Sequence, residues 1–262
     1  MIAWLINKSL NLVPRRFLQR VAHLVVPVVG LFYRGRGRIC PICHNRYRRF
    51  MPYGYGSVRH DALCPSCLSL ERHRALWLYL TEHTRIFEEH PTLLHIAPEI
   101  SLMRHFKRAY ATCRERYITA DLESPLAELH FDVEQIPLDA ESVDVIICNH
   151  LLEHVADDRR AMRELYRILR SGGWAVVMVP QDESRATTYE DDSITDPKER
   201  AERFGQYDHR RIYGRDYTER LAAEGFEVEQ IDYRERLTAE ECQRYGLSGD
   251  KIYVAHRPAN KN

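Results

Sequence analysis

The chain of 262 residues carries 38 basic and 38 acidic side chains, so its formal charge at pH 7 is zero, which excludes a uniformly basic nucleic-acid binder. The first 60 positions hold 11 Lys or Arg and no Asp or Glu, so a basic N-terminal part precedes an acidic body with 27 basic and 38 acidic residues. With 44% apolar residues, 12 Gly and 12 Pro, the composition is that of a globular protein with a sizeable core.

The N-terminal sequence indicates neither a membrane span nor a secretory signal. The longest apolar stretch, residues 21–33, is interrupted by Pro27 and falls short of the ~18 residues that span a bilayer. Asn7 and Asn11 break up the apolar start, and no clear signal cleavage site follows. We therefore expect a cytoplasmic protein, in which regularly spaced cysteines hold metal more often than they form disulfides.

The first segment, residues 1–37, is expected to be helical and amphipathic. Pro14 suits the first turn of a helix, and nearby arginines fall mostly opposite a set of apolar residues. That set comprises Phe17, Leu18, Val21, Leu24, Val25 and Val28. Two interpretations stay open: residues 1–33 pack on the protein itself, or they lie in an anionic membrane surface, which would place the protein peripherally at the inner face of the membrane.

Residues 38–68 carry the strongest metal-binding signal of the chain. Cys40 and Cys43 form one Cys-x-x-Cys pair, and Cys64 and Cys67 form a second pair 20 residues later. Two such pairs can present four thiolates in the tetrahedral arrangement that Zn²⁺ prefers. A site closed by four protein ligands has no open position for water or substrate. We therefore predict a zinc ribbon in which the four cysteines hold a structural metal.

Residues 46–55, between the cysteine pairs, interleave arginines with aromatic residues. We favour a β-hairpin with exposed arginines and packed aromatics, and a platform for RNA bases is the alternative. Residues 69–91 then connect the ribbon to the body, with a helix expected over 69–82 and Ser69 as its N-cap. The polar run 71–74 either faces solvent or borders a substrate cleft.

Residues 92–262 alternate short apolar runs with helical patterns. The expected strands are 93–97, 117–120, 143–148 and 175–179, and the expected helices are 101–111, 157–169 and 215–224. This alternation predicts a doubly wound α/β fold, in which helices cover both faces of a mostly parallel sheet. Ligands of such sheets bind at the carboxyl ends of the strands, so the residues that follow each strand are the candidates for a site.

Polar residues do follow the predicted strands. Asp121 comes directly after the second strand, where a carboxylate can accept hydrogen bonds from the hydroxyls of a ribose. Asn149 and His150 follow the strand at 143–148 and open the run Asn-His-Leu-Leu-Glu-His-Val. Farther along, Arg-Ser-Gly-Gly at 170–173 is expected to end a helix in a glycine turn before the next strand.

Residues 92–180 resemble the cofactor-binding half of the class I S-adenosylmethionine-dependent methyltransferases, in particular the type 11-like subgroup. The most specific part is 136–180, with its Leu-Glu-His-Val segment and its Leu-Arg-Ser-Gly-Gly turn. The resemblance implies S-adenosylmethionine as the cofactor and a Rossmann-like sheet of seven strands that ends in an antiparallel hairpin. Residues 226–233 and 251–256 are suited to those last two strands.

The resemblance also implies roles for individual residues. It assigns Asp121, with Leu122, to the ribose of the cofactor. It assigns Asp132 to the adenine amino group, counts Val133 among the cofactor-binding residues, and places Asn149 with His150 beside cofactor and substrate.

The first loop departs from the family pattern, because the usual glycine-rich turn has no glycine in this chain. The residues in its place are His95, Ala97, Pro98 and Glu99. We expect a remodelled loop that still binds the cofactor, with Glu99 holding its ammonium group. His95 is either a contact of the cofactor or a core residue at the end of the strand.

Two histidines are candidate bases, because the methyl acceptor must lose a proton and a side chain with a near-neutral pKa suits that task. His150 follows the strand that ends beside the cofactor. His209 lies in a polar, aromatic loop, 204–214, which either covers the same strand ends or is a surface loop in which His209 caps the following helix. The long insertion 181–203 is expected to form another part of that cover.

Three functions compete for this sequence. A methyltransferase that acts on a small molecule, a glycan or a lipid-linked intermediate comes first. An RNA methyltransferase whose zinc ribbon grips the phosphate backbone comes second, because the acidic body argues against a long RNA track. A noncatalytic, zinc-stabilised binding protein on the same scaffold comes third, because a fold alone does not determine function.

Overall fold

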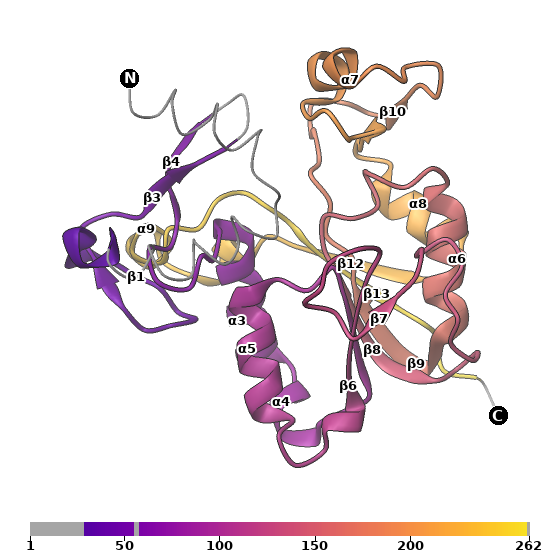
Figure 1. Ribbon diagram of the computed structural model, residues 1–262, viewed down its shortest axis with the longest axis horizontal. Coiled ribbons are helices and arrows are strands. Elements are labelled where there is room, and N and C mark those ends of the chain that lie inside the picture. Colours follow the sequence, from indigo (N-terminus) through magenta and orange to yellow (C-terminus); the bar gives the residue numbers. More distant parts are fainter. Residues whose placement is uncertain (1–28, 55–57, 261–262) are drawn as a thin grey trace.

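The computed structural model describes residues 29–54 and 58–260, and within these ranges one seven-stranded sheet forms the centre of the protein (Figure 1). In spatial order the strands are β12 (Glu227–Ile231), β13 (Ile252–His256), β9 (Leu169–Val176), β8 (Val143–Cys148), β5 (Leu93–Ile96), β6 (Tyr117–Asp121) and β7 (Leu129–His130). The strands from β9 to β7 are parallel, whereas β13 is antiparallel to both of its neighbours. The predicted Rossmann-like sheet with a closing antiparallel hairpin is therefore confirmed.

Helices cover both faces of this sheet. Successive residues of a strand point to opposite sides, so one strand can pack apolar side chains against helices on either face. On one side lie α3 (Glu71–His83), α4 (Ile86–Glu89) and α5 (Ile100–Ala109), and on the other lie α6 (Asp158–Ile168) and α8 (Tyr217–Ala223) (Figure 1). In β5, Leu93 packs in the same core as α3 and α5, while Leu94 packs in the core that contains α6 and α8. The predicted doubly wound arrangement follows from strands that are apolar on both faces.

The connecting helix begins later than predicted. It was expected over 69–82 and spans Glu71–His83, with Leu70 rather than Ser69 as its N-cap. The hydroxyl of Ser69 instead lies 3.2 Å from the sulfur of Cys67. A residue that is suited to capping is thus used to support the cysteine cluster.

The strand expected over 175–179 begins earlier than predicted, at Leu169, directly after the last residue of α6. The two glycines therefore lie inside β9 and not in a turn before it. Gly172 has a positive φ of 80°, and the pairing with β8 changes register across this segment. The two glycines accommodate an irregularity within the strand. From the sequence alone, glycines that follow a helix are expected to form a turn, so this irregularity was not foreseen.

The N-terminal part of the described chain consists of two small antiparallel hairpins. β1 (Arg34–Ile39) pairs with β2 (Arg46–Tyr47), and β3 (Met51–Tyr53) pairs with β4 (Arg59–Leu63). Tyr47 and Phe50 are buried. The neighbouring arginines Arg46, Arg48 and Arg49 are exposed. The arginines are exposed and two aromatics are packed, as the hairpin interpretation expects, but Tyr53 is 45% exposed, and β2 and β3 pair with β1 and β4 and not with each other.

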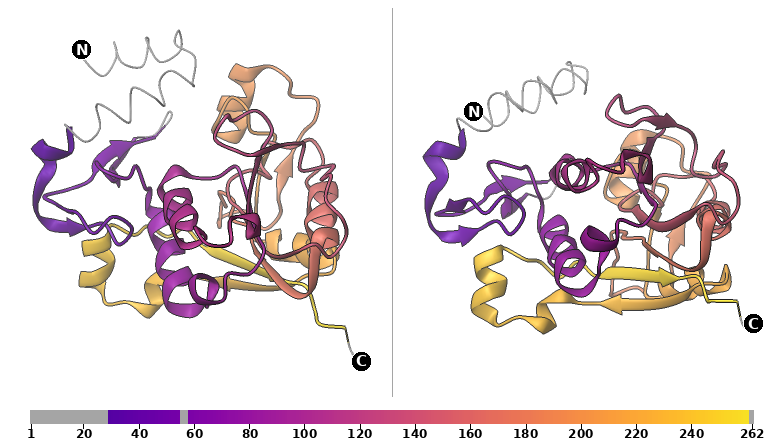
Figure 2. Two further views of the ribbon diagram at one scale, coloured as in Figure 1. Left: turned by 60° about the horizontal axis from the view of Figure 1, so that its bottom comes forward. Right: turned by 90° about the horizontal axis from the view of Figure 1, so that it is seen from below.

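The connection between the last two strands reaches back to the ribbon. It contains a 3-10 helix, η2 (Tyr233–Arg236), and α9 (Ala239–Tyr245), which lies against β1 (Figures 1 and 2). Arg74 of α3 is fully buried at this junction and donates hydrogen bonds to four backbone carbonyl oxygens. The acceptors, at 2.6 to 2.9 Å, are Ala62, Ser69, Tyr245 and Gly246. One side chain thus joins the ribbon, the connecting helix and a segment near the C-terminus.

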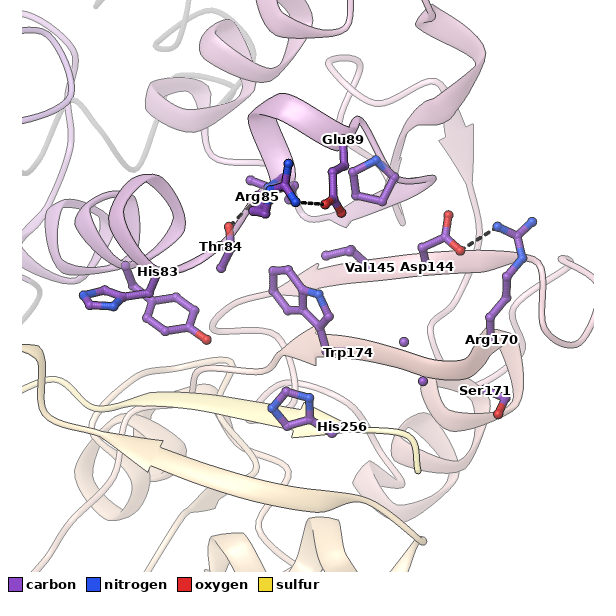
Figure 3. A pocket seen from close by; sticks show the side chains of 15 residues that line it. His83, Thr84, Arg85, Glu89, Asp144, Val145, Arg170, Ser171, Trp174 and His256 are labelled. Carbon is purple, nitrogen blue, oxygen red and sulfur yellow. Dashed lines mark hydrogen bonds and ion pairs between the residues drawn. The ribbon is translucent and has the colours of Figure 1, made fainter. Parts of the chain in front are cut away.

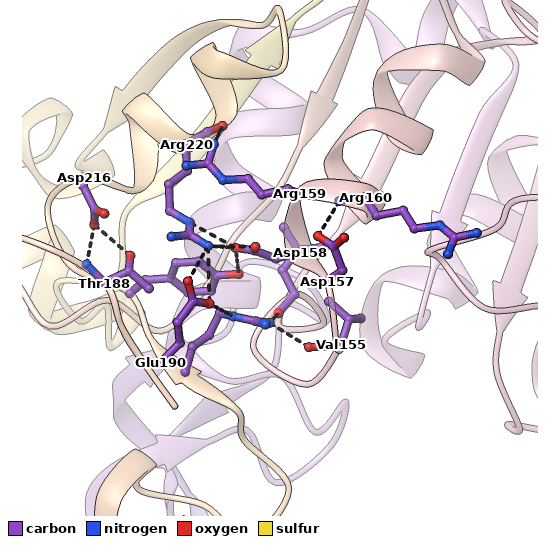
Figure 4. Close-up of polar contacts among 12 residues, drawn as sticks. Val155, Asp157, Asp158, Arg159, Arg160, Thr188, Glu190, Asp216 and Arg220 are labelled. Carbon is purple, nitrogen blue, oxygen red and sulfur yellow. Dashed lines mark hydrogen bonds and ion pairs between the residues drawn. The ribbon is translucent and has the colours of Figure 1, made fainter. Parts of the chain in front are cut away.

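The segment predicted to cover the site contains β10 (Tyr189–Glu190), α7 (Pro197–Phe204) and β11 (Arg211–Ile212). A buried ionic network fastens it to α6 and α8 (Figure 4). The carboxylate of Asp158 accepts hydrogen bonds from Arg220 at 2.8 and 2.9 Å and from the hydroxyl of Tyr213 at 2.9 Å. Arg220 also contacts Glu190 of β10 at 3.2 Å. Tyr213 is fully buried, whereas Glu190 is 43% exposed, so a buried hydroxyl contact and a partly exposed ion pair hold the cover in place.

The amphipathic helix predicted over 1–33 falls mostly on residues 1–28, which lie outside the described residues. β1 begins at Arg34, before the boundary expected at residue 38. Among the helices of the described ranges, none is long and apolar enough to cross a membrane.

Substitution Arg220→Met should destabilise the protein by about 3–5 kcal/mol, because the buried Asp158 would lose the cation that pairs with it. Arg85→Met is the matched control: Arg85 pairs with Glu88 and Glu89, and all three side chains are more than half exposed. Its loss should cost less than about 1 kcal/mol. Urea unfolding followed by circular dichroism measures both changes, and equally small changes would contradict a stabilising role of the buried network.

Candidate functional site

A cleft of about 970 Å³ opens at the carboxyl ends of β5, β6 and β8. One wall is formed by the loop 97–101, the loop 121–126 and the pair Asn149 and His150. The other wall comes from the ribbon and the start of α3. Its residues are Tyr53, Leu63, Leu68, Leu70, Arg72 and His73. Residues of the sheet and residues of the ribbon therefore line the cleft together.

Most of the residues predicted to bind the cofactor line this cleft. They are Ala97, Pro98, Glu99, Asp121, Leu122 and Asn149, and the candidate base His150 joins them. The other predicted residues do not line it. Asp132 is exposed elsewhere, Val133 belongs to the apolar core and His95 is fully buried. His209 lies in the cover, against His154.

The carboxylate of Glu99 is the centre of a polar cluster at the end of β5. His95 Nε2 lies 2.7 Å from Oε2, and Asn149 Nδ2 donates to Oε1 at 3.0 Å. Burial raises the pKa of Glu99, but the hydrogen bond and charge of His95 outweigh this effect and hold the pKa below its usual range. Glu99 is therefore an oriented carboxylate at the floor of the cleft.

His95 positions this carboxylate from the core. Its Nδ1 lies 3.0 Å from the hydroxyl of Tyr117, and its Nε2 points to Glu99. The sequence left open whether His95 contacts the cofactor or is a core residue at the end of the strand, and the structure favours the core residue.

The glycine-free loop adopts a conformation that glycine favours. Ala97 has a φ of 49°, in the left-handed region that costs an L-residue roughly 1–2 kcal/mol. The chain then enters α5, whose first backbone N–H groups, at Ile100 and Ser101, have no partner within the helix. Such a helix N-terminus favours an anionic group. The loop thus keeps the backbone shape of a glycine turn without the glycine.

Asp121 is oriented by its own loop. Its Oδ1 accepts hydrogen bonds from the backbone N–H groups of Glu123 and Ser124 at 2.9 and 2.7 Å. Oδ2 receives no hydrogen bond from any residue that the structure describes, so it can accept one from a ligand hydroxyl. Beside it, Leu122 is 63% exposed and offers an apolar surface at the edge of the cleft.

The sequence left open whether the polar run 71–74 faces solvent or borders a cleft, and it did not predict that Tyr53, Leu63 and Leu68 of the ribbon line the cleft. Of the polar run 71–74, Arg72 and His73 line the cleft, whereas Glu71 and Arg74 are buried. The backbone N–H of Leu70 donates to His73 Nδ1 at 3.2 Å, and burial lowers the pKa of His73 to about 3, so the neutral ring carries its proton on Nε2. That nitrogen lies 3.8 Å from Glu99. The helical pattern alone does not reveal which face of this run meets the body.

Several buried polar atoms in the cleft have no hydrogen-bond partner among the described residues. They are Arg72 Nε, His73 Nε2, Ser101 Oγ and Asn149 Oδ1. Because buried polar groups in proteins are normally paired, these atoms are expected to meet a polar ligand. The cleft therefore presents both donors and an acceptor to a bound molecule.

A second polar cluster lies in the loop after β8. His150 Nδ1 is 3.4 Å from Glu153 Oε1, and His154 Nε2 is 3.9 Å from the same oxygen. The ring of His154 meets the ring of His209 at a centroid distance of 4.8 Å. The buried Arg211 supports this loop through the backbone oxygens of Leu152, Val155 and Ala156. Sequence reasoning assigned no role to Glu153, although it lies within the Leu-Glu-His-Val run.

The four cysteines of the predicted ribbon come together. Their sulfur atoms all lie within 4.8 Å of one another. Cys40 and Cys67 are 3.5 Å apart, and Cys43 and Cys64 are 3.7 Å apart. Hydrogen bonds with the neighbouring thiols lower the pKa of the Cys40 thiol. The cluster is compatible with one tetrahedral zinc ion.

The two cysteine pairs form matching turns. A backbone hydrogen bond joins His44 to Cys40 at 2.8 Å and Leu68 to Cys64 at 3.1 Å. His44 and Leu68 have nearly the same positive φ, 59° and 61°. Both turns therefore present their sulfurs in the same way, as the spacing predicts.

A smaller cleft of about 550 Å³ lies at the opposite end of the sheet (Figure 3). Asp144 at the amino end of β8, Trp174 of β9 and His256 of β13 line it. Asp144 pairs there with Arg170 at 2.7 Å. Because parallel sheets of this kind bind ligands at their carboxyl ends, we place the functional site in the larger cleft.

A comparison with known families and proteins finds relatives for the body. A family model described as a methyltransferase domain matches residues 100–177. A probable S-adenosylmethionine-dependent methyltransferase of Mycolicibacterium smegmatis is 29% identical over 119 residues, which cover 45% of this chain and 40% of that protein. The chain thus spans less than half the length of this relative.

Solved structures that are similar to this chain share little sequence with it. An S-adenosylmethionine-dependent methyltransferase from Mesorhizobium loti is 17% identical, with a TM-score of 0.45, over 70% of this chain and 98% of its own. The YcgJ protein from Bacillus subtilis is 16% identical, with a TM-score of 0.44, over 72% of this chain and 100% of its own. The match to the methyltransferase domain model covers residues 100–177, and this range includes Asp121, Asn149 and His150 of the cleft.

Proposed function

We propose that the protein transfers the methyl group of S-adenosylmethionine to a small molecule, a glycan or a lipid-linked intermediate that enters the cleft between sheet and ribbon. One observation carries this proposal: Glu99, Asp121 and Asn149 line one wall of a cleft in a methyltransferase domain, and the ribbon closes the other side. The ribbon would therefore contact the methyl acceptor.

The residues of the cleft fit the cofactor group by group. Asp121 Oδ2 suits the ribose hydroxyls, and the exposed Leu122 suits the flat face of the adenine. Glu99 and Asn149 Oδ1 suit the ammonium group, and Ser101 at the N-terminus of α5 suits the carboxylate. In support, the buried atoms of Ser101 and Asn149 that have no partner among the described residues would gain one.

His150 is placed to receive the proton that the acceptor loses. When bound, S-adenosylmethionine supplies a methyl group on a positively charged sulfur, which leaves readily. Glu153 lies 3.4 Å from His150 Nδ1 and favours the proton on that nitrogen, so Nε2 is free to accept. The cleft would also hold the acceptor in line with the methyl group, and this alignment supplies much of the remaining rate acceleration. His209, the other predicted base, does not line the cleft, and a different role for it is argued below.

The charges in the cleft favour a small acceptor over RNA. Within the described ranges, Arg72 is the one Lys or Arg that lines the cleft, whereas Glu99, Asp121 and Glu123 are acidic. A phosphate backbone calls for several basic contacts. The RNA alternative draws its support from the exposed arginines of the ribbon, and those arginines do not line the cleft.

We also propose that the four cysteines hold a structural Zn²⁺. Ser69 Oγ lies 3.4 Å from the sulfur of Cys40 and 3.2 Å from that of Cys67, which is the kind of outer contact that orients metal ligands. Leu68 and Leu70, on either side of Ser69, line the cleft. The metal would therefore shape the ribbon wall without taking part in the chemistry.

Substitution Asp121→Asn should weaken S-adenosylmethionine binding about tenfold or more. The amide oxygen can still accept from Glu123 and Ser124, but the second oxygen, which is free for a ribose hydroxyl, becomes a donor. Isothermal titration calorimetry measures the affinity, and the exposed Asp139→Asn is the control that should not change it. Unchanged affinity in Asp121→Asn would contradict the assignment of the ribose.

Methyl groups carrying a radioactive label should pass from S-adenosylmethionine into the small-molecule or lipid fraction of a cell extract. His150→Asn should reduce this transfer about 10²-fold to 10⁴-fold, because a general base is lost. Asn tolerates the positive φ of 52° at this position. His90→Asn, at a positive-φ histidine with φ 47° outside the cleft, is the matched control. Label in RNA alone would refute the proposed acceptor class.

Substitution Cys40→Ser should remove one zinc ion per chain and lower the thermal stability, because one of four thiolate ligands is lost. Cys242→Ser, at a cysteine outside the cluster, should keep the metal. Elemental analysis after dialysis measures the zinc content. Equal zinc in both variants and the wild type would show that the cluster does not bind it.

A further inference from the structure

We propose that Glu153, His154 and His209 form a second metal site, which binds a divalent transition-metal ion next to the cleft. The ligand atoms of these three residues lie within 4.8 Å of one another. Two of them belong to the loop after β8, and the third comes from the cover before β11. The site is separate from the four-cysteine cluster and differs from it in ligand chemistry.

Both histidines of this site are held with one ring nitrogen free. His154 Nδ1 lies 3.3 Å from the backbone oxygen of Asp208, and His209 Nδ1 lies 3.2 Å from the backbone oxygen of Phe204. A carbonyl oxygen can only accept, so each Nδ1 carries a proton, and in the neutral form of each ring Nε2 has the lone pair that a metal ion can bind. A hydrogen bond from one ring nitrogen to a carbonyl is the usual support of an imidazole whose other nitrogen binds a metal.

Glu153 supplies the negative charge of the site. The residue is 1% exposed, and its Oε2 has no hydrogen-bond partner among the described residues. In the neutral form of His154, Nε2 places a lone pair 3.9 Å from Oε1 of this carboxylate. A buried carboxylate that faces lone pairs is unfavourable unless a cation lies between them. A metal ion would satisfy the carboxylate and both imidazoles at once.

The ligand set indicates the class of metal. Two imidazoles and one carboxylate suit Zn²⁺, Mn²⁺ or Fe²⁺ in open sites, and three protein ligands leave coordination positions free. Glu153 also contacts His150, which lines the cleft. The open positions would therefore bind an oxygen of the methyl acceptor, such as a hydroxyl or carboxylate. This last step rests on the proposed function, whereas the metal site itself does not.

A metal count in four forms of the full-length protein tests the site. Wild type, Glu153→Gln, His209→Ala and His83→Ala are each incubated with Zn²⁺, Mn²⁺ or Co²⁺, freed of excess metal by gel filtration and analysed by mass spectrometry. For at least one of these metals, the wild type and His83→Ala should hold one ion per chain more than the two site variants. His83 is exposed at the end of α3 and controls for the loss of a histidine.

Calorimetry with S-adenosylmethionine on the same samples separates this proposal from the proposed function. Cofactor affinity close to that of the wild type in either site variant shows that its lower metal content is not due to unfolding. Equal metal content in all four forms, for all three metals, would overturn the second metal site. Absence of cofactor binding by the wild type would count against the proposed function and leave the metal count valid.

Discussion

The placement of the ribbon depends on one buried cation, the guanidinium of Arg74. It donates to carbonyl oxygens of three segments and stacks over the ring of Phe50 at 4.2 Å. Burial lowers the pKa of Arg74, and the nearby sulfurs and Glu71 act in the opposite direction. A buried cation is destabilising unless negative charge compensates it. Four thiolates around Zn²⁺ carry net negative charge, so metal and arginine would stabilise each other.

This junction determines the shape of the cleft. Arg74 follows Arg72 and His73, so the contacts that hold its side chain also direct its two neighbours toward the body. Tyr53 of the basic N-terminal part lines the cleft, together with Arg72 of α3 and with Glu99 and Asp121 of the body. The opposite net charges of these two parts add to zero over the chain, and both parts contribute residues to one cleft.

Features that depend on local pattern could be predicted from the sequence. The sheet follows from strand periodicity, the ribbon from cysteine spacing, and Asp121 from its position after a strand. For the run 71–74 the sequence left solvent and cleft as alternatives, and the ribbon's part of the wall and the Glu153 cluster could not be predicted, because distant residues form them. Arg74 bonds to Tyr245, 171 positions away, and His209 meets His154 only through the fold of the cover. The shape of the glycine-free loop differs from the remodelled loop that we expected, because Ala97 adopts a backbone conformation that its side chain disfavours.

The central claim is that sheet and ribbon together form one cofactor and acceptor site. A crystal structure of the full-length protein with S-adenosylhomocysteine, the cofactor product, tests it most directly. We predict the ribose on Asp121, the amino-acid part beside Glu99 and Asn149, and the sulfur facing a space between His150 and the ribbon wall. A product bound outside this cleft, or a ribbon turned away from the bound product, would contradict the account.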